Sequence, residues 1–574
     1  MESNAQLLDF LTKCPLFDGI EKAKIEKIIP SLEKVQVEAG QTLLSEESTP
    51  EGIYIVNWGK LVLIQKDKFI HYFSKNDHFG ALYFLTDTPV KRYIKALRDS
   101  ELFILPKEMF LELIKAESKV LQNITKTIAS DVHNSFTVKK KKKRARIFAL
   151  IPHKDEPSFV DFYEKIFDLF KEIEDTVILK EGDSKKLEEH DEENKTLLLI
   201  CSHKMDEWTN LAIHNADKAI TVASRKSKPD LSEVETKIKE MNFLDRHLIL
   251  LYDGDEKIEG TKDWLKKREV RTHQHVFYQD PESINRIFRI LSERSLAVVL
   301  SGGGAKGHAQ LGFLLACIEK GIKIDIIGGT SAGAIMGGVY GCGWRKEEII
   351  ENGPSIFHTE GGVFDYTLPF VSALKGKRAV KKLKKYTKDL DIEDFKTTFF
   401  CASSNLTLKA PHMHTSGSLA TALRASTSLP GIYSPVYIDH NVFVDGVLFN
   451  NLPIDMCKQY DPGKIIAVNV STDNPRIEYK PFPPSISGWR KLFRLFMRKE
   501  MHIPSFFDVL ALTTEISGRT YKQKLIKDHV ADLQIDLPVE HIEMLDFKNY
   551  AEIQRIGYEY SKKNIDTWIK ELGL

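Results

Sequence analysis

Hydrophobic and polar positions alternate in short runs over the first 138 residues. The segments EGIYIVNWGKLVLIQKD (51–67) and IKALRDSELFILPKEMF (94–110) show this period of two, and glycines and other turn residues separate such runs. Alternation at this spacing predicts a small β-roll or barrel. The flanks, 5–12 and 107–136, have helical spacing instead. Residues 1–138 are therefore predicted to form a β-roll with helices at both ends.

The pattern changes after the basic run KKKKKRAR (139–146). That run is interpreted as a solvated linker, with contact to an anionic surface as the alternative. Over 147–290, apolar runs alternate with charged helical stretches, which predicts a parallel α/β sheet. The candidate strands are RIFALIPH, TVILKEG, TLLLICSH, KAITVAS, RHLILLYDG and HVFYQD. The segment has no GxxxxGK[ST] motif, so we expect no phosphate loop there and predict a structural or regulatory role.

A second α/β unit is predicted from LAVVL (296–300) to about residue 475. The remaining residues, 476–574, form a mixed extension with helical periodicity near 551–571. Within this extension, GWRKLFRLFMRK (488–499) places aromatic and leucine side chains on one helical face and basic side chains toward the other. Such a basic amphipathic helix suits a membrane surface, although a helix packed on the catalytic domain would have the same pattern.

Composition limits the partners and the compartment. The 574 residues are 42% hydrophobic and 28% charged, with a net charge of +1. No overall field would attract nucleic acid, and we expect none as a partner. The six cysteines include no CxxC pair, which favours a reducing compartment and no zinc site. With no apolar leader and no run of 18 apolar residues, the sequence predicts a cytoplasmic protein that meets any membrane peripherally.

Candidate chemistry is concentrated at the start of the second α/β unit. LAVVL leads into SGGGAKG, a helix follows, and the strand KIDIIGG ends at a turn that carries Ser331 between Gly329 and Gly333. This spacing is typical of a nucleophile elbow. In a βαβ unit both loops lie at the same sheet edge, so the backbone N–H groups of Gly302, Gly303 and Gly304 are candidate oxyanion donors.

The same glycines allow a second interpretation. Gly302, Gly304 and Gly307 also fit the dinucleotide pattern GxGxxG. That pattern requires an acid at the end of the second strand, whereas Asp325 lies near the start of the strand and GGTSAG occupies its end. A plain glycine-rich helix start is the further alternative for GTSAG. The pairing of the two glycine motifs favours the nucleophile elbow.

The base that would accept the serine proton is predicted to be Asp445. It follows the apolar run VYIDHNVFV and precedes Gly446, at a strand-to-turn position. A carboxylate can serve as general base when it lies within hydrogen-bond distance. Asp-Gly is also an ordinary turn pair, which is the structural alternative. The downstream histidines, His502, His529 and His541, do not lie in comparable positions.

These motifs resemble those of the patatin-like phospholipases. SGGGAKG, GTSAG, ALRASTSLPGIYSPV and VDGVLFNNLP occur in the family's order. The resemblance implies Ser331 as nucleophile, Asp445 as base and Gly302 to Gly304 as oxyanion loop, supported by Gly307, Gly329, Gly333 and Gly446. Val447 departs from the family's usual glycine or alanine and is expected to narrow the site. YTLPFVSALKGKR (366–378), the middle domain and LDFKNYAEIQRIGYEY (545–560) are similar to the neuropathy target esterase branch.

The N-terminal β-roll resembles cyclic-nucleotide-binding domains. In FGALYFLTDTPVKRYIKAL (79–97), Ala81 occupies the position of the family's ribose-binding glutamate, and Val90 that of its phosphate-binding arginine. Loss of both charged ligands removes charge-assisted hydrogen bonds of about 1.5–3 kcal/mol each. We therefore predict a degenerate domain that binds cyclic nucleotides weakly or not at all. Substitution by Lys91 or Arg92 is the alternative, but a two-residue shift should point the side chain elsewhere.

The resemblance implies a multidomain α/β protein that is a lipid acyl hydrolase. Its expected substrate is a phospholipid or lysophospholipid, and neither a cofactor nor a metal is expected. A lipid acyltransferase and a regulatory scaffold with a vestigial hydrolase are the alternatives. The sequence leaves a homo-oligomer open.

Overall fold

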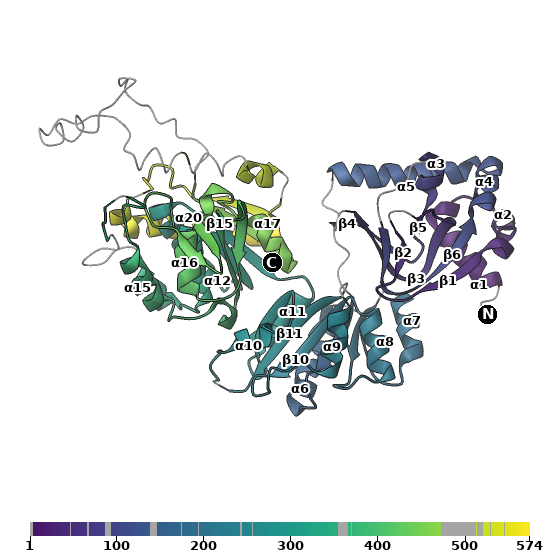
Figure 1. Ribbon diagram of the computed structural model, residues 1–574, viewed down its shortest axis with the longest axis horizontal. Coiled ribbons are helices and arrows are strands. Elements are labelled where there is room, and N and C mark those ends of the chain that lie inside the picture. The colour runs from purple at the N-terminus through teal and green to yellow at the C-terminus, as the bar shows by residue number, and fades with distance from the viewer. Residues whose placement is uncertain are drawn as a thin grey trace, which may run out of the picture. The chain divides into compact units, whose positions relative to one another are not determined.

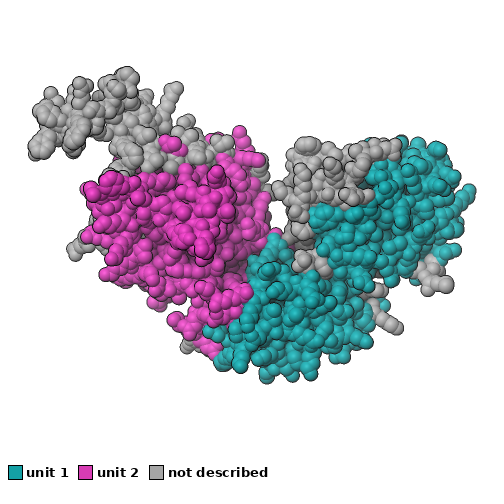
Figure 2. Space-filling view, viewed as in Figure 1, with its two compact units in different colours: residues 1–251, 267–272 teal, residues 252–266, 273–574 magenta. Residues whose placement is uncertain are grey.

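A computed structural model describes residues 4–45, 48–65, 68–86, 93–137, 146–173, 175–192, 195–241, 244–254, 256–353, 365–368, 370–471, 513, 521–527, 530–544 and 546–573. The chain divides into two compact units, residues 1–251 with 267–272, and residues 252–266 with 273–574 (Figure 2). Val90, residues 139–145 of the basic run and the segment 488–499 lie outside the described residues. In the described part, no helix is long and apolar enough to cross a membrane.

Unit 1 begins with the predicted β-roll (Figure 1). Its strands pair antiparallel in the order β1-β6-β3-β4, with β2 on β6 and β5 on β3. Their bounds are β1 Glu33–Val37, β2 Thr42–Leu44, β3 Gly52–Gln65, β4 Lys68–Ser74, β5 His78–Phe79 and β6 Tyr93–Pro106. The burial of β6 alternates along most of its length, as the period of two predicts.

Helices cover one side of the roll. They are α1 Asn4–Lys13, α2 Lys22–Glu26, α3 Ala81–Thr86, α4 Lys107–Ala116 and α5 Ser118–Thr137, so both predicted helical flanks are confirmed. A second cluster fills the roll itself, where Phe79 stacks on Tyr54 at a centroid distance of 5.0 Å and contacts Phe73 at 4.6 Å. Ala81 is buried beside Phe84 in the core under the helices. The position expected to hold a ribose-binding acid is thus part of an apolar core.

The rest of unit 1 is a parallel sheet with the strand order β11-β10-β7-β9-β8. Its strands are β7 Ile147–Pro152, β8 Thr176–Leu179, β9 Thr196–Ile200, β10 Lys218–Ser224 and β11 Asp245–Tyr252. The connecting helices are α6 Pro157–Ile173, α7 Ser184–Glu192, α8 Glu207–Asn215 and α9 Glu233–Glu240. The β7 strand is buried at every position, which explains its unbroken apolar run.

A half-buried ion pair joins the roll to this sheet within unit 1. Lys60 on β3 donates to the Asp217 carboxylate at 2.6 Å, and the backbone N–H groups of Arg146 and Ile147 donate to the same carboxylate. Burial alone would raise the pKa of Asp217, but the charges of Lys60 and Arg98 lower it well below its usual range. Asp217 is therefore held as a carboxylate.

Unit 2 is built on an eight-stranded mixed sheet with the order β17-β18-β15-β14-β13-β19-β20 and β16 on β15. The strands are β13 Leu296–Leu300, β14 Ile326–Thr330, β15 Thr398–Asn405, β16 Ala410–His414, β17 Val436–Ile438, β18 Asn441–Asp445, β19 Lys464–Asn469 and β20 Leu533–Asp536. The helices of unit 2 are α10 Thr261–Leu265, α11 Pro281–Leu291, α12 Gly307–Lys320, α13 Ala332–Gly341, α14 Lys346–Asn352, α15 Lys377–Tyr386, α16 Leu419–Ser426, α17 Ile454–Cys457 and α20 Tyr550–Leu572.

One expected strand differs from its prediction, and the apolar run before Asp445 contains a turn. HVFYQD was expected as a strand, but β12 spans Thr272–Phe277, because Asp280 caps α11 by accepting a hydrogen bond from the N–H of Glu282. The run VYIDHNVFV forms a hairpin of β17 and β18. Its turn residues, Asp439 and His440, both have positive φ, which suits a two-residue hairpin turn.

The C-terminal extension contributes to the same sheet and core. The β20 strand pairs in parallel with β19. The long helix α20 packs on α12, and Gly557 allows this approach, because a Cβ there would lie 2.6 Å from the carbonyl carbon of Ala309. Residues beyond 475 therefore complete the fold that carries the predicted site.

Candidate active site

Ser331 lies at the turn between β14 and α13. It is the N-cap of α13 and has φ 54° and ψ −119°, a backbone conformation that residues other than glycine rarely adopt. The turn also packs tightly against the end of β13. A Cβ on Gly329 would lie 2.6 Å from the carbonyl oxygen of Leu300, and a Cβ on Gly333 would lie equally close to that of Ser301. The flanking glycines of the predicted elbow are thus required by close packing.

Asp445 reaches the serine because β18 and β14 share one edge of β15. The β16 strand pairs with residues 401–405 of β15, so β14 (on 398–402) and β18 (on 403–405) must both use the opposite edge. Thr330 pairs with Ala402, and Asp445 pairs with the next residue, Ser403. The carboxyl ends of β14 and β18 therefore meet end to end.

This meeting places the two predicted residues in contact. The Ser331 hydroxyl donates to Asp445 Oδ2 at 2.8 Å. Ser331 is half-buried, whereas Asp445 is buried. Burial raises the pKa of Asp445 to about 7, although hydrogen bonds from the N–H of Val447 and from Ser331 act to lower it. A carboxylate with a pKa near neutrality suits a general base at physiological pH.

Backbone contacts fix the orientation of Asp445. Its other oxygen, Oδ1, accepts from the N–H of Val447 at 3.0 Å. Its own N–H donates to the carbonyl of Ser428, and its carbonyl accepts from the Ser404 hydroxyl. Gly446 is needed here as well, since a Cβ would lie 2.6 Å from the Ala402 carbonyl oxygen. Val447 contributes its backbone, so its departure from the family pattern leaves this contact in place.

The glycine loop lies directly beside Ser331. A Cβ on Gly302 would lie 3.1 Å from the Cβ of Ser331. The N–H of Gly302 is already used, since it donates to the backbone carbonyl and to the side-chain oxygen of Asn451, each at 3.1 Å. For Gly303 and Gly304 the described residues supply no acceptor to the backbone N–H, and both glycines are partly exposed. Of the three predicted donors, the N–H of Gly302 therefore holds the loop in place, and those of Gly303 and Gly304 are available to bind an oxyanion.

The C-terminal extension supports this loop. The carbonyl of Met544 accepts from the N–H of Ala305 at 2.8 Å. Gly304, at φ 58°, packs so closely on Met544 that a Cβ would collide with it. On the other side of the loop, a Cβ on Gly303 would lie 2.6 Å from a methyl group of Val470. Gly307 allows α12 to approach α13 at Ala332.

Sequence reasoning missed the side chains that hold the site. Ser426 accepts from the N–H of Ser331 at 2.9 Å and donates to the carbonyl of Ala402 at 2.6 Å. Arg424, also buried, donates to the Ser428 hydroxyl and stacks on Tyr433. Both residues belong to ALRASTSLP, and Asn451 belongs to VDGVLFNNLP, so the motifs were visible. What they contact depends on the sheet register, which the sequence does not reveal.

The alternative candidates occupy other positions. Asp325 lies at the amino end of β14, where it pairs with Arg289 at 2.7 Å and accepts from the N–H of Leu296. That role is structural and does not suit a ribose-binding acid. Among the candidate histidines, His541 is exposed, and His502 and His529 lie outside the described residues. No group of three or more histidine, cysteine or acidic side chains in the described ranges is arranged to hold a metal ion.

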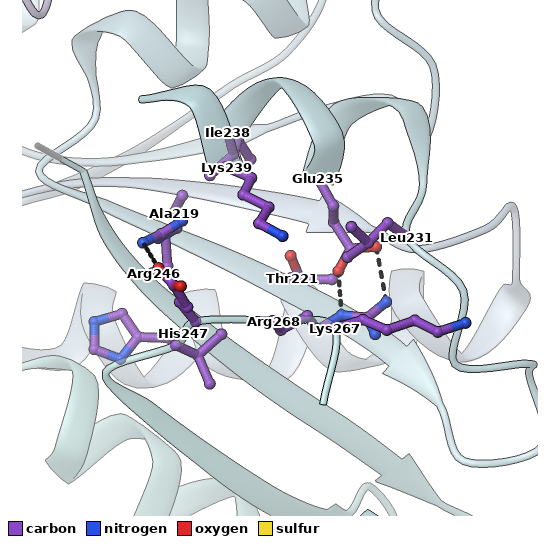
Figure 3. Close-up of a pocket in the computed structure, with 12 residues that line it drawn as sticks. Ala219, Thr221, Leu231, Glu235, Ile238, Lys239, Arg246, His247, Lys267 and Arg268 are labelled. Atoms are coloured by element: carbon purple, nitrogen blue, oxygen red, sulfur yellow. Dashed lines mark hydrogen bonds and ion pairs between the residues drawn. The ribbon is translucent and has the colours of Figure 1, made fainter. Parts of the chain in front are cut away.

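Unit 1 also contains a small pocket between α9 and the strands β10 and β11 (Figure 3). Four of its charged side chains pair with one another. Arg268 donates to both oxygens of Glu235, at 2.6 and 3.0 Å, and Arg246 lies 3.6 Å from Glu269. Paired side chains of this kind stabilise the sheet and helix. The residues with the arrangement of a catalytic centre are those around Ser331.

Models of three known families match successive parts of the chain. The model of the patatin-like phospholipase family matches residues 298–458. That of the neuropathy target esterase family P-loop like domain matches residues 175–297, and that of the cyclic nucleotide-binding domain matches residues 34–117. Ser331 and Asp445 both lie within the patatin match.

Similar proteins extend over nearly the whole chain. Patatin-like phospholipase domain-containing protein 7 of Mus musculus is 24% identical over 95% of this chain and 46% of its own length. An uncharacterized NTE family protein of Mycobacterium bovis is 24% identical over 94% of this chain and 93% of its own. Lysophospholipase NTE1 of Mycosarcoma maydis is 24% identical over 98% of this chain and 35% of its own. The chain thus spans about half the length of the mammalian relative.

The fold and the site together define a patatin-like phospholipase domain protein. Matches to the cyclic nucleotide-binding domain and to the neuropathy target esterase family P-loop like domain precede the patatin match in the chain, and the relatives that are similar over nearly the whole chain include NTE family proteins.

Proposed function

We propose that this protein is a serine lipid acyl hydrolase that releases fatty acid from a phospholipid or lysophospholipid. The observation that carries the proposal is the 2.8 Å hydrogen bond from the Ser331 hydroxyl to a buried carboxylate, beside a glycine loop with available backbone N–H groups. The patatin match and the lysophospholipase among the relatives support a lipid ester as the substrate.

The first half-reaction forms an acyl-enzyme. Ser331 Oγ attacks the acyl carbonyl carbon while its proton passes to Asp445 Oδ2. The N–H groups of Gly303 and Gly304 stabilise the negative charge that develops on the carbonyl oxygen. The ester bond then breaks, and Asp445 returns the proton to the departing alcohol oxygen of the lipid. One proton is taken and one is given back, so Asp445 ends this step ionised.

The second half-reaction releases the fatty acid. Water attacks the acyl-enzyme and gives its proton to Asp445, and that proton then passes to Ser331 Oγ as the acyl bond breaks. The backbone contacts around Asp445 keep Oδ2 directed at Ser331 through both steps. Because a single carboxylate is both base and acid, a pKa near 7 suits both roles better than the usual value near 4.

Fluorophosphonate labelling tests the nucleophile, and fatty-acid release from lysophosphatidylcholine tests the substrate. Wild type should label and release fatty acid, whereas Ser331→Ala should do neither and Asp445→Asn should lose hydrolysis. Labelling without fatty-acid release would refute the proposed substrate class, and transfer of the acyl group to an added lysolipid would assign the protein as an acyltransferase. Absence of labelling would favour a scaffold with a vestigial hydrolase.

A further inference from the structure

An exposed apolar loop lies next to the candidate active site. Between β14 and β15 the chain presents four large apolar side chains to solvent, and it does so within a few residues. Their exposed fractions are Tyr366 76%, Leu368 73%, Phe370 90% and Val371 70%. Single exposed apolar residues are common on protein surfaces, but a cluster of this kind marks an interaction site.

The apolar loop is held in shape by hydrogen bonds. The N–H of Thr367 donates to the carbonyl of Ala373, and that of Lys375 donates to the carbonyl of Asp365. The Asp365 carboxylate accepts from the N–H groups of Gly376 and Arg378, at 2.7 and 3.1 Å. Burial acts to raise the pKa of Asp365, but these N–H groups lower it overall, so the anchor stays ionised. These hydrogen bonds fix the backbone on both sides of the exposed side chains.

This loop is connected to the residues that orient Asp445. The N–H groups of Ala373 and Leu374 donate to the carbonyls of Gly431 and Ile432, each at 2.9 Å. Gly431 follows shortly after Ser428, whose carbonyl accepts from the N–H of Asp445. The segment 428–432 thus connects the exposed loop to Asp445 through backbone hydrogen bonds at both of its ends. A surface that bound the loop would therefore be connected through this segment to Asp445.

A basic helix continues directly from the loop. Residues 375–388 contain eight lysines and arginines and no acidic residue. Within α15, Leu383 and Tyr386 are buried, while Lys377, Lys381 and Lys385 recur every fourth residue on the exposed side. Burial, and then the charge of Lys385, lower the pKa of Lys382 to about 8. The helix therefore offers a dense positive face beside the apolar loop.

We propose that the loop residues Tyr366, Leu368, Phe370 and Val371, together with the basic face of α15, dock this protein on an anionic lipid surface. This inference rests on the proposed function, because it explains how a site around Ser331 would meet a substrate held in a membrane or micelle. Apolar and aromatic side chains insert at the headgroup boundary, and neighbouring lysines pair with anionic lipids. A surface with both features fits such an interface better than a second protein.

Vesicle binding tests the docking surface, and it is measured in a Ser331→Ala background so that no lipid is hydrolysed. The apolar variant carries Leu368→Ser, Phe370→Ser and Val371→Ser, and the charge variant carries Lys377→Glu, Lys381→Glu and Lys385→Glu. Matched controls change exposed residues elsewhere, namely Leu121→Ser, Val160→Ser and Ile350→Ser, and Lys22→Glu, Lys27→Glu and Lys563→Glu.

On phosphatidylcholine vesicles with about 30% phosphatidylserine, the charge variant should bind about 100-fold more weakly and the apolar variant at least about 10-fold more weakly. The controls should bind like the parent protein. With Ser331 restored, all variants should hydrolyse a soluble short-chain ester at the parent rate. That assay separates the two proposals, since loss of soluble-ester hydrolysis in the parent itself would refute the catalytic site alone.

Three results would overturn the docking surface. The first is unchanged vesicle binding in both patch variants, and the second is an equal loss in the controls. The third is a parent protein that forms dimers in light scattering while the apolar variant is monomeric, which would assign the patch to a second copy of this chain.

Discussion

The β-roll and the sheet of unit 2 show two different outcomes at a predicted binding position. At the end of β14, Ser331 and Asp445 meet at 2.8 Å, and the glycines around them are required by close packing. In the β-roll, Ala81 is buried in an apolar core at the position where cyclic-nucleotide-binding domains have a glutamate. Aromatic side chains fill the interior of that roll. We therefore expect the β-roll to keep its fold without its polar ligands, whereas the proposed catalytic centre requires each polar group in register.

The largest expected effect comes from the nucleophile. Ser331→Ala should reduce hydrolysis of lysophosphatidylcholine by at least about 10³-fold, because no other group forms the acyl-enzyme. Fatty-acid release measured with purified protein checks this. A similar reduction of activity by Ala81→Glu in the β-roll would contradict the difference between the two regions.

The dependence on pH should follow Asp445. Since its pKa is about 7 and the base must be ionised, kcat/KM should rise tenfold per pH unit below pH 7 and level off above it. The profile is measured with a soluble ester so that lipid charge stays constant. A plateau that extends down to pH 5 would contradict the assigned base.

Ionisation of Asp445 should also lower the free energy of unfolding at neutral and alkaline pH. Its folded pKa of about 7 lies above the unfolded value near 4, so the folded state binds the proton more tightly. The contribution of the Asp445 proton to the free energy of unfolding is therefore complete below about pH 4. It decreases as the pH rises toward 7, by up to about 4 kcal/mol. Asp445→Asn should therefore melt at a higher temperature than wild type at pH 8 and at a similar temperature at pH 4.5. Equal melting temperatures at pH 8 would refute the buried ionised carboxylate.

A smaller effect is expected from Ser426. Ser426→Ala removes the acceptor for the N–H of Ser331 and a donor to the carbonyl of Ala402. The loss should lower the free energy of unfolding by about 1–3 kcal/mol. It should also lower kcat more than it raises KM. Steady-state kinetics separates the two constants. Ser434→Ala serves as a control nearby, since its half-buried hydroxyl makes longer hydrogen bonds, donating to the carbonyl of Lys375 at 3.3 Å and accepting from Arg424 at 3.4 Å. An equal loss in both variants would indicate a general effect of the loop.

The smallest effect is expected from cyclic nucleotides. Addition of 3′,5′-cyclic AMP should leave the melting temperature unchanged, because the position of the ribose acceptor is apolar. Calorimetric titration with the full chain measures the affinity directly. Tight binding would mean that Lys91 or Arg92 replaces the missing cation, and the two regions would then differ less than Ala81 indicates.

Much of the fold could be predicted because single elements carry their own pattern. The fully apolar strands β7 and β13, the alternating β6 and the elbow at Ser331 were all visible in the sequence. The hairpin of β17 and β18 was missed because Asp439 and His440 are a weak turn signal. The placement of β18 at the end of β14 was also beyond sequence reasoning, since pairing between distant strands is set by tertiary packing. Asp445 was found from its local Asp-Gly position, but Ser426, Asn451 and Met544 act only through that packing.

The contact between Met544 and the oxyanion loop has a consequence for synthesis of the protein. Ser331 and Asp445 are made well before Met544, β20 and α20, which lie against or near the glycine loop. A chain still emerging from the ribosome therefore has its dyad but lacks the segment that supports Ala305 and Gly304. The proposed hydrolase therefore becomes competent only after the segment from Met544 through α20 has been made and has folded against the loop.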